Sequence, residues 1–247
     1  MWINNNWKGS FVKTQMARRM LSALSAAVVI SGLTGCAATA NNPKDPYEGF
    51  NRTMYSVNEG IDVVVKPIAQ GYDAAAPLPV KAGVGNFFGN IADVWIAVNN
   101  FLQGKGGQGL SDAGRFLVNT TIGIGGVFDI ASEMGLEKHA EDFGQTLGKW
   151  GVDEGAYLFW PLIGPRTTRD TFGWVVDSYA DPLKRVDNVA LRNSLTGVRL
   201  IDIRASLLST DKVVEQAAFD KYNYIRDAYL QNRRSAVLDG SPPAIKE

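Results

Sequence analysis

The 247-residue chain contains a single cysteine, Cys36, which stands just after a short apolar run. One cysteine cannot form an intramolecular disulfide, so the fold has to be stabilised by packing and hydrogen bonding. The run, residues 20–33, is apolar apart from serine and glycine. Its length of about 14 residues is typical of a signal-peptide core and too short to span a bilayer. The only charged residues before it are basic: Lys8, Lys13, Arg18 and Arg19.

The segment Leu33-Thr34-Gly35-Cys36 resembles the lipobox of bacterial lipoprotein signal peptides. The resemblance implies that residues 1–35 are removed and that Cys36 becomes the first mature residue, acylated on its thiol and its new amino group. An alternative stays open, because residues 38–40 form an A-x-A sequence after which an ordinary signal peptidase could cut and release a soluble protein.

Two further features bear on how the leader is used. Residues 16–19 open a compact signal peptide, whereas residues 1–15 form an unusual extension, so we expect translation to begin at Met16. Ala37 follows the cysteine where enteric lipoproteins kept in the inner membrane carry aspartate. By that resemblance, the outer membrane is the expected destination.

The composition of the chain after the leader restricts which classes of protein it can belong to. The chain has 25 basic and 25 acidic residues; the leader holds four basic and no acidic ones, which leaves 21 against 25, a net charge of −4. That balance lacks the basic footprint of a nucleic-acid binder, so we expect no nucleic-acid partner. Beyond the leader no apolar run reaches 18 residues, so we predict no spanning helix.

Apolar residues recur at helical spacing along most of the mature chain, and no stretch shows convincing strand alternation. We therefore predict an all-α fold, with a single helical domain over residues 45–238. Residues 36–44 are predicted to be a lipidated tether, and residues 239–247 a disordered tail.

The first and last helices carry the clearest end signals. Asp45 is predicted to be the N-cap of the first helix, and Pro67 to kink or end it. Its apolar face is predicted to contain Phe50, Met54, Val57, Ile61 and Val64. The last helix, which contains Phe219, is predicted to direct three arginines outward: Arg226, Arg233 and Arg234.

Residues 80–103 form the most unusual predicted helix, because apolar residues cover well over half of its circumference and its polar positions are mostly asparagines. At about 36 Å it could cross a bilayer, but asparagines in mid-membrane are costly without partners. We therefore expect the helix to lie in one leaflet. Phe87, Phe88 and Trp95 would then contact lipid, and Asn90 would face the protein or a bore.

Glycines divide the middle of the chain into short segments. A turn is predicted at residues 105–109, before a helix capped by Ser111 or Asp112. Three further glycines either line a channel or form tight turns, and the sequence leaves both readings open: Gly123, Gly125 and Gly126. The aromatic run at residues 157–163 is predicted to be an exposed contact for a membrane or a protein.

A catalytic centre is not evident in the sequence. No P-loop and no G-x-S-x-G nucleophile elbow occurs, and His139 is the only histidine. A hydrolase would have to use His139 with Glu141 or Asp142, whereas a lone surface histidine in a charged loop is the favoured interpretation. We expect no enzymatic activity, no cofactor and no metal.

Several long, ordered motifs occur across residues 45–177. The most specific are Asp45-Pro46-x-Glu48-x-x-Asn51-Arg52, Asn86-Phe87-Phe88-x-Asn90, Arg115-Phe116-x-x-Asn119, and Glu141-Asp142-Phe143-Gly144-Gln145-Thr146-Leu147-Gly148-x-Trp150-Gly151. They resemble the VacJ/MlaA family of outer-membrane phospholipid-transport lipoproteins.

The family resemblance implies a ring-like bundle of short and long helices in the inner leaflet of the outer membrane, around an amphipathic channel. It further implies a protein, lipid-anchored on the periplasmic side, that removes misplaced phospholipids from the outer leaflet and thereby maintains lipid asymmetry. The implied partners are phospholipids, a trimeric porin and a periplasmic phospholipid carrier. The alternative is a structural lipoprotein that braces a porin without transporting lipid.

Replacing the lipobox cysteine tests the anchor directly. Two or more acyl chains hold a protein stably on a membrane, whereas a single chain binds only marginally. Cys36→Ala should therefore leave an unprocessed or mislocalised precursor and abolish function, as seen by immunoblotting of fractionated cells. A variant that still matures and fractionates with the outer membrane would instead favour cleavage after Ala40.

Overall fold

The computed structural model describes residues 42–240. Its helices are α2 (Glu48–Ala75), α3 (Leu78–Leu102), α4 (Gly106–Thr121), α5 (Ile130–Glu133), α6 (Phe143–Lys149), α7 (Thr168–Ala180), η1 (Pro182–Arg185), α8 (Val189–Ser206), α9 (Leu208–Ala217) and α10 (Lys221–Val237). The predicted predominance of helix in one domain is confirmed. The signal peptide, Cys36 and most of the tether lie outside the described residues.

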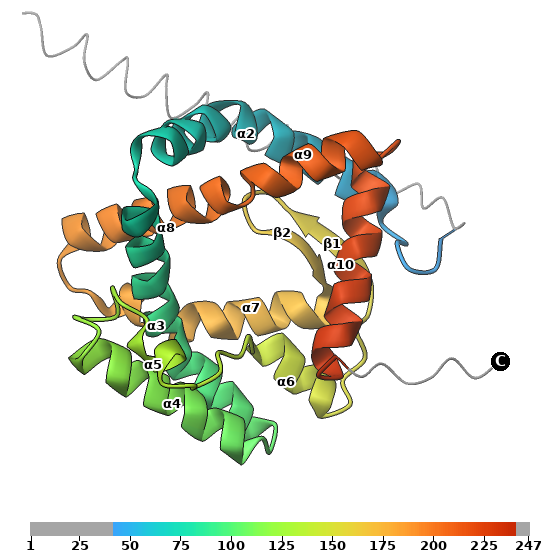
Figure 1. The fold of residues 1–247 in the computed structure, drawn as a ribbon. Coiled ribbons are helices and arrows are strands. Elements are labelled where there is room, and N and C mark those ends of the chain that lie inside the picture. Colours follow the sequence, from blue (N-terminus) through green and yellow to red (C-terminus); the bar gives the residue numbers. More distant parts are fainter. Residues whose placement is uncertain (1–41, 241–247) are drawn as a thin grey trace, which may run out of the picture.

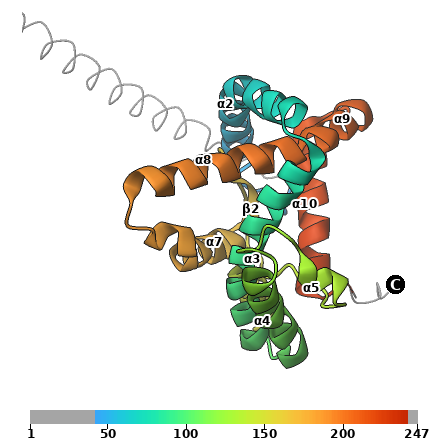
Figure 2. The same cartoon turned by 60° about the vertical axis from the view of Figure 1, so that its left-hand side comes forward.

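The elements follow the outline of a ring in Figure 1, with α2 and α9 above, α10 at the right, α6 and α4 below and α3 at the left. Helix α3 packs on α4, α6 on α7, and α2 on α8. Figure 2 shows α7 and α8 extending together on one side of the molecule. The chain therefore returns to its beginning, and α10 packs near the first turns of α2.

A short antiparallel hairpin, which the sequence did not predict, lies between α6 and α7. It consists of β1 (Tyr157–Trp160) and β2 (Gly164–Thr167), with Tyr157 opposite Thr167 and Trp160 opposite Gly164. Strands of four residues are too short to show a convincing alternation of polar and apolar side chains. The hairpin is thus set by its packing between α2 and α10.

The hairpin also corrects the predicted exposure for part of the run at residues 157–163, although Leu162 in its turn is exposed. Tyr157 and Phe159 are buried in the apolar core, together with Met54, Tyr222 and Leu230. Alternate strand residues point to one face, so β1 offers both aromatic rings to α2 and α10.

Helix α2 differs from the prediction at its start, and Pro67 does not end it. Pro67 lies inside the helix, which continues to Ala75. Asp45 is not the N-cap; Tyr47 holds that position, and the Asp45 carboxylate is fully buried. On the predicted apolar face Met54 is buried, but Val64 is exposed.

The glycine-rich segment after α3 was predicted to be a turn, but α4 begins there, at Gly106. A Cβ atom at Gly109 would fall 2.8 Å from the ring of Phe101. Gly109 therefore allows α4 to pack closely on α3. The predicted cap at Ser111 or Asp112 is wrong, because both residues lie inside α4, whose N-cap is Lys105. Asp142, Thr167 and Asn188 cap the helices that follow them, and each accepts a hydrogen bond from a backbone N–H in the first turn.

Asn51 joins α2 to the hairpin. Its Nδ2 donates to Asp45 Oδ1 at 2.8 Å and to the carbonyl of Tyr157 at 2.9 Å, and its Oδ1 accepts from the N–H of Phe159 at 2.9 Å. The side chain is fully buried, so each of these bonds replaces a bond to water.

We expect Asn51→Leu to destabilise the protein by about 3 kcal/mol, because it leaves buried backbone groups of β1 unpaired. Urea unfolding followed by circular dichroism measures the change. The matched control is Thr53→Ala on the exposed side of α2, which should cost less than about 0.5 kcal/mol. Equal losses in the two variants would refute the role assigned to Asn51.

Candidate functional site

Polar residues occupy the interior of this protein to an unusual degree. Among the described residues, sixteen polar or charged residues are buried, against twelve hydrophobic ones. Large apolar side chains are exposed on most helices instead, among them Val63 on α2, Leu117 on α4 and Phe172 on α7. Buried polar groups are costly unless paired, and exposed apolar patches of this extent mark contact surfaces.

The asparagines of α3 turn toward the protein, as the sequence predicted. Asn90 Nδ2 donates to Thr120 Oγ1 at 2.9 Å, and Asn100 Nδ2 donates to Asp112 Oδ2 at 2.7 Å. Asn99 Oδ1 accepts from Thr146 Oγ1 at 2.7 Å. These bonds attach α3 to α4 and α6. The asparagines of α3 therefore lie in the interface between these helices.

The three residues predicted to contact lipid are buried or half-buried. Phe88 is only 8% exposed. Phe87 is half-buried against the Phe88 ring, and Trp95 is half-buried, with its Nε1 donating to Asp177 Oδ1 at 2.7 Å. Lipid contact by these side chains stays a prediction, and Phe88 has the least surface for it. The exposed apolar residues of α3 are Val94 and Val98 in its middle, with others near its ends.

A small polar pocket of about 60 Å³ lies beside Asn90. Arg115 donates from Nη2 to both oxygens of Asp129 at 2.8 Å, and Lys138 Nζ lies 2.6 Å from Asp93 Oδ1. Burial would raise the pKa of the Asp129 carboxyl, but hydrogen bonds from Ser132, Asn119 and Arg115 lower it below its ordinary value. The volume is too small for a lipid headgroup.

Burial raises the pKa of the Asp93 carboxyl in the same region, against the opposing effect of Lys138. The carboxylate is fully buried, and its second oxygen lies 3.6 Å from Arg115 Nε. The pocket is therefore a charge-paired junction between α3, α4 and the loop after α5.

The predicted glycines of the α4–α5 loop differ in their roles. A Cβ atom at Gly123 would fall 2.2 Å from the Phe128 carbonyl oxygen, and one at Gly126 would fall 2.5 Å from Asn90 Cβ. Gly125 has a φ of +68° and open space around it. Between them, Ile124 has a φ of +52°, which costs a β-branched residue about 1–2 kcal/mol. Gly123 thus serves close packing, Gly125 serves the turn, and Gly126, with a φ of +89°, serves both.

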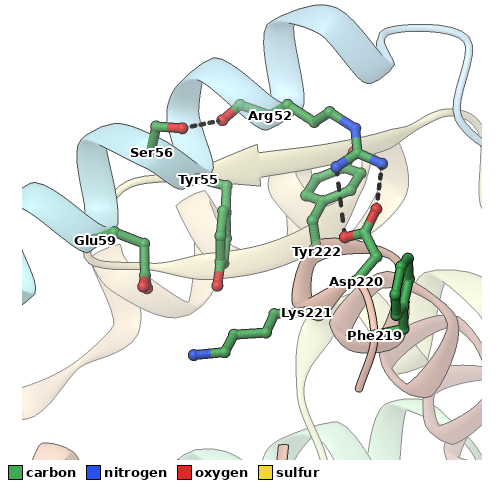
Figure 3. A pocket seen from close by; sticks show the side chains of 8 residues that line it. All are labelled: Arg52, Tyr55, Ser56, Glu59, Phe219, Asp220, Lys221 and Tyr222. Carbon is green, nitrogen blue, oxygen red and sulfur yellow. Dashed lines mark hydrogen bonds and ion pairs between the residues drawn. The ribbon is translucent and has the colours of Figure 1, made fainter. Parts of the chain in front are cut away.

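A larger cavity of about 560 Å³ opens between α2 and the start of α10 (Figure 3). Arg52 Nη2 donates to Asp220 Oδ2 at 2.8 Å, and its guanidinium lies 4.4 Å from the centre of the Tyr222 ring. Lys221 and Glu59 add one charge of each sign, so the charges lining the cavity balance. Sequence reasoning did not single out this cavity, because its residues come from segments far apart in the chain.

His139 is half-buried and pairs with Asp112, not with Glu141 or Asp142. Its Nδ1 lies 3.1 Å from both oxygens of Asp112. Glu141 instead accepts from Gln103 and Lys105. The pairing of His139 with Glu141 or Asp142, which the hydrolase hypothesis required, is therefore not formed.

The arginines of α10 correct a further prediction. Arg226 and Arg233 are buried, whereas Arg234 points outward and pairs with Glu154. Arg233 donates to Asp142 Oδ2 at 2.6 Å and to Asp170 Oδ1 at 3.0 Å.

The first residue of the predicted tail is also placed. Asp239 forms ion pairs with Lys149 and Lys105, and residues 241–247 lie outside the described part of the chain. None of the helices within residues 42–240 has the length and apolarity to cross a membrane.

Comparison with known proteins agrees with this architecture. Residues 43–236 match the MlaA lipoprotein family. The chain is 35% identical over 228 residues to the intermembrane phospholipid transport system lipoprotein MlaA of Escherichia coli (strain K12), covering 89% of each chain. It is 32% identical to the protein of that name in Haemophilus influenzae (strain Rd), covering 93% of this chain and 94% of the relative.

A solved structure from work on the structural basis for maintenance of bacterial outer membrane lipid asymmetry is also similar. It superposes with a TM-score of 0.68 at 32% identity and covers 78% of this chain and 98% of its own. The predominantly helical fold and these relatives define the class of protein as one similar to bacterial phospholipid-transport lipoproteins. The chain belongs to the MlaA lipoprotein family.

The Arg233 cluster gives a prediction with a defined pH dependence. Burial would raise the pKa values of Asp142 and Asp170, but Arg233 outweighs it and lowers both. Carboxylates with lowered pKa values stabilise the fold above their unfolded pKa, near about 4, and lose this contribution as the pH falls through the folded pKa.

Arg233→Gln should therefore destabilise the protein by about 3–5 kcal/mol near neutral pH, because it leaves two carboxylates without their partner. The difference from wild type should narrow below about pH 4. Urea unfolding near neutral pH and below about pH 4 measures the loss of stability in each condition. The control is the exposed Arg234→Gln, which should destabilise the protein by less than about 1 kcal/mol. A difference that is independent of pH would contradict this account.

Proposed function

We propose that this chain removes misplaced phospholipids from the outer leaflet of the outer membrane and passes them to a periplasmic carrier. It would be anchored through Cys36 on the periplasmic side, with its helical body in the inner leaflet around an amphipathic channel and beside a trimeric porin. The names of its relatives, which refer to intermembrane phospholipid transport and outer membrane lipid asymmetry, support this proposal.

The observation that carries the proposal is the reversed distribution of polarity. Exposed valines and other large apolar residues suit a lipid environment, while the buried asparagines, aspartates and arginines give a polar interior. Moving a phospholipid with about 30 methylene groups into water costs roughly 24 kcal/mol at about 0.8 kcal/mol per CH₂. A protein with an apolar rim and a polar interior can lower this cost, because it offers separate surfaces to the chains and the headgroup.

The outer face of α3 is the part of the rim that the structure allows us to assign for testing. Val94 and Val98 are exposed and stand four residues apart, so they share one face of the helix. Trp95 and Phe87 lie beside that face and could contribute their exposed edges. Asn90, one turn before Val94, is buried instead, against Gly126 and bonded to Thr120, where we expect the packing that supports the headgroup path.

A structural lipoprotein that braces a porin is the alternative. It would need the exposed contact surface but would not need the buried asparagines of α3. Variants at exposed and at buried positions of α3 therefore discriminate between the two functions.

We expect Val94→Asp and Val98→Asp to weaken membrane embedding, because a carboxylate at hydrocarbon depth costs about 2.5–3.5 kcal/mol. Asn90→Leu should impair lipid transport with less effect on embedding. In a deletion strain complemented with each variant, a membrane-impermeant amine reagent measures phosphatidylethanolamine on the cell surface, and liposome flotation measures embedding.

Val94→Leu is the matched control and should behave as wild type in both assays. If the deletion strain shows no rise in surface phosphatidylethanolamine, the transport function is wrong. If Asn90→Leu restores asymmetry fully while the valine variants fail, the bracing role becomes the better account.

A further inference from the structure

Two large apolar residues hold a left-handed backbone conformation with their side chains exposed. Ile124 in the α4–α5 loop is 69% exposed, and Leu162 in the turn of the hairpin has a φ of +66° and is 65% exposed. This conformation favours glycine, and a Cβ branch makes isoleucine especially unsuited to it. Within residues 42–240, the other non-glycine residue with positive φ is Asp239, a type that tolerates it. Neither apolar side chain offsets its backbone cost by burial in the protein.

The loop that carries Ile124 is uncharged and firmly held. All thirteen residues between Arg115 and Asp129 are uncharged, and the ion pair between those two residues closes its base. The N–H groups of Gly125 and Gly126 donate to the carbonyls of Thr120 and Asn119 at 3.0 and 2.7 Å. The loop therefore has a fixed shape, in which two more large side chains are exposed beside Ile124: Ile122 and Phe128.

The turn that carries Leu162 repeats this arrangement with different residues. The eleven residues between Glu154 and Arg166 are all uncharged. The N–H of Leu162 donates to Asn58 Oδ1 on α2 at 2.9 Å, which holds the turn in place. Two unrelated segments thus present an apolar side chain from a backbone position where glycine would be more stable.

The chemistry of both segments favours hydrocarbon as the medium around them. A protein partner normally meets an apolar centre surrounded by a polar rim. The charged residues that border the α4–α5 loop, Arg115 and Asp129, are instead paired with each other at its base. Lipid chains accept apolar side chains and require that nearby backbone groups be bonded within the protein. The internal hydrogen bonds of the α4–α5 loop meet that requirement in part.

We propose that Ile124 and Leu162 insert between the acyl chains of the surrounding lipid layer, where the apolar contact offsets their unfavourable backbone conformation. The proposal rests on the proposed function only in taking a lipid layer as the partner, and it does not require transport. Its tests therefore measure lipid contact and leave lipid asymmetry to the experiment described above.

The first test places a label at each position in the full-length acylated protein, reconstituted into vesicles of phosphatidylethanolamine and phosphatidylglycerol. Ile124→Cys and Leu162→Cys are labelled with a polarity-sensitive fluorophore, and Glu137→Cys in the exposed α5–α6 connection is the matched control. Lipids with a quencher on the acyl chain should quench the labels at 124 and 162, and aqueous iodide should quench only the label at 137. Iodide quenching at 124 equal to that at 137, or protection of 124 from both quenchers, would overturn the proposal.

The second test uses the unlabelled chain in the same vesicles, which now contain a phospholipid with a photoreactive diazirine in its acyl chain. Mass spectrometry should find adducts on peptides that contain residues 124 and 162. Ile124→Asn should lower the adduct yield at the first peptide at least about fivefold, and Ile124→Leu should preserve it. Ile124→Asn should unfold at a temperature no lower than wild type, because asparagine tolerates positive φ. Equal adduct yields in Ile124→Asn and Ile124→Leu would contradict the proposal.

Discussion

The closure of the helical ring depends on buried charge pairs made by α10. Arg226 Nη1 lies 3.3 Å from the carboxylate of Asp45, which also accepts a hydrogen bond from the Tyr222 hydroxyl at 2.6 Å. One turn from the end of the same helix, Arg233 pairs with carboxylates from α6 and α7. The last helix is thereby attached to the start and the middle of the chain. Breaking such a pair leaves an uncompensated buried charge, so the ring tolerates little change there.

The large number of buried, paired polar side chains is consistent with a protein domain that is in contact with lipid. When the surroundings are as apolar as the side chains, burying apolar surface gives little stabilisation, and close packing and internal hydrogen bonds carry more of it. The contact between α6 and α7 shows this, because a Cβ atom at Gly173 would fall 2.4 Å from the backbone nitrogen of Gly144. The two helices approach backbone to backbone beneath the Arg233 cluster.

Helix α3 shows how far sequence reasoning reached at the candidate site. Its length and the inward direction of its asparagines were predicted, because an asparagine without a partner is costly in any apolar environment. The choice of Phe88 as a lipid contact failed to match its burial, whereas Val94 and Val98 are exposed. A helix that is apolar around most of its circumference carries no periodic signal for which apolar side faces the protein.

The sequence by itself determined the lipobox pattern at Cys36, the helical content and the family. These depend on residues a few positions apart or on long ordered motifs, which a reader of the chain can see. Only the tertiary structure decided that Asp45, Arg226 and Arg233 are buried, and that the 157–167 segment forms a hairpin. The physical reason is distance along the chain, because Arg226 meets Asp45 across 181 positions and Arg233 meets Asp170 across 63. From the sequence alone a charged residue is predicted to be exposed, because its buried partner can be identified only in the folded structure.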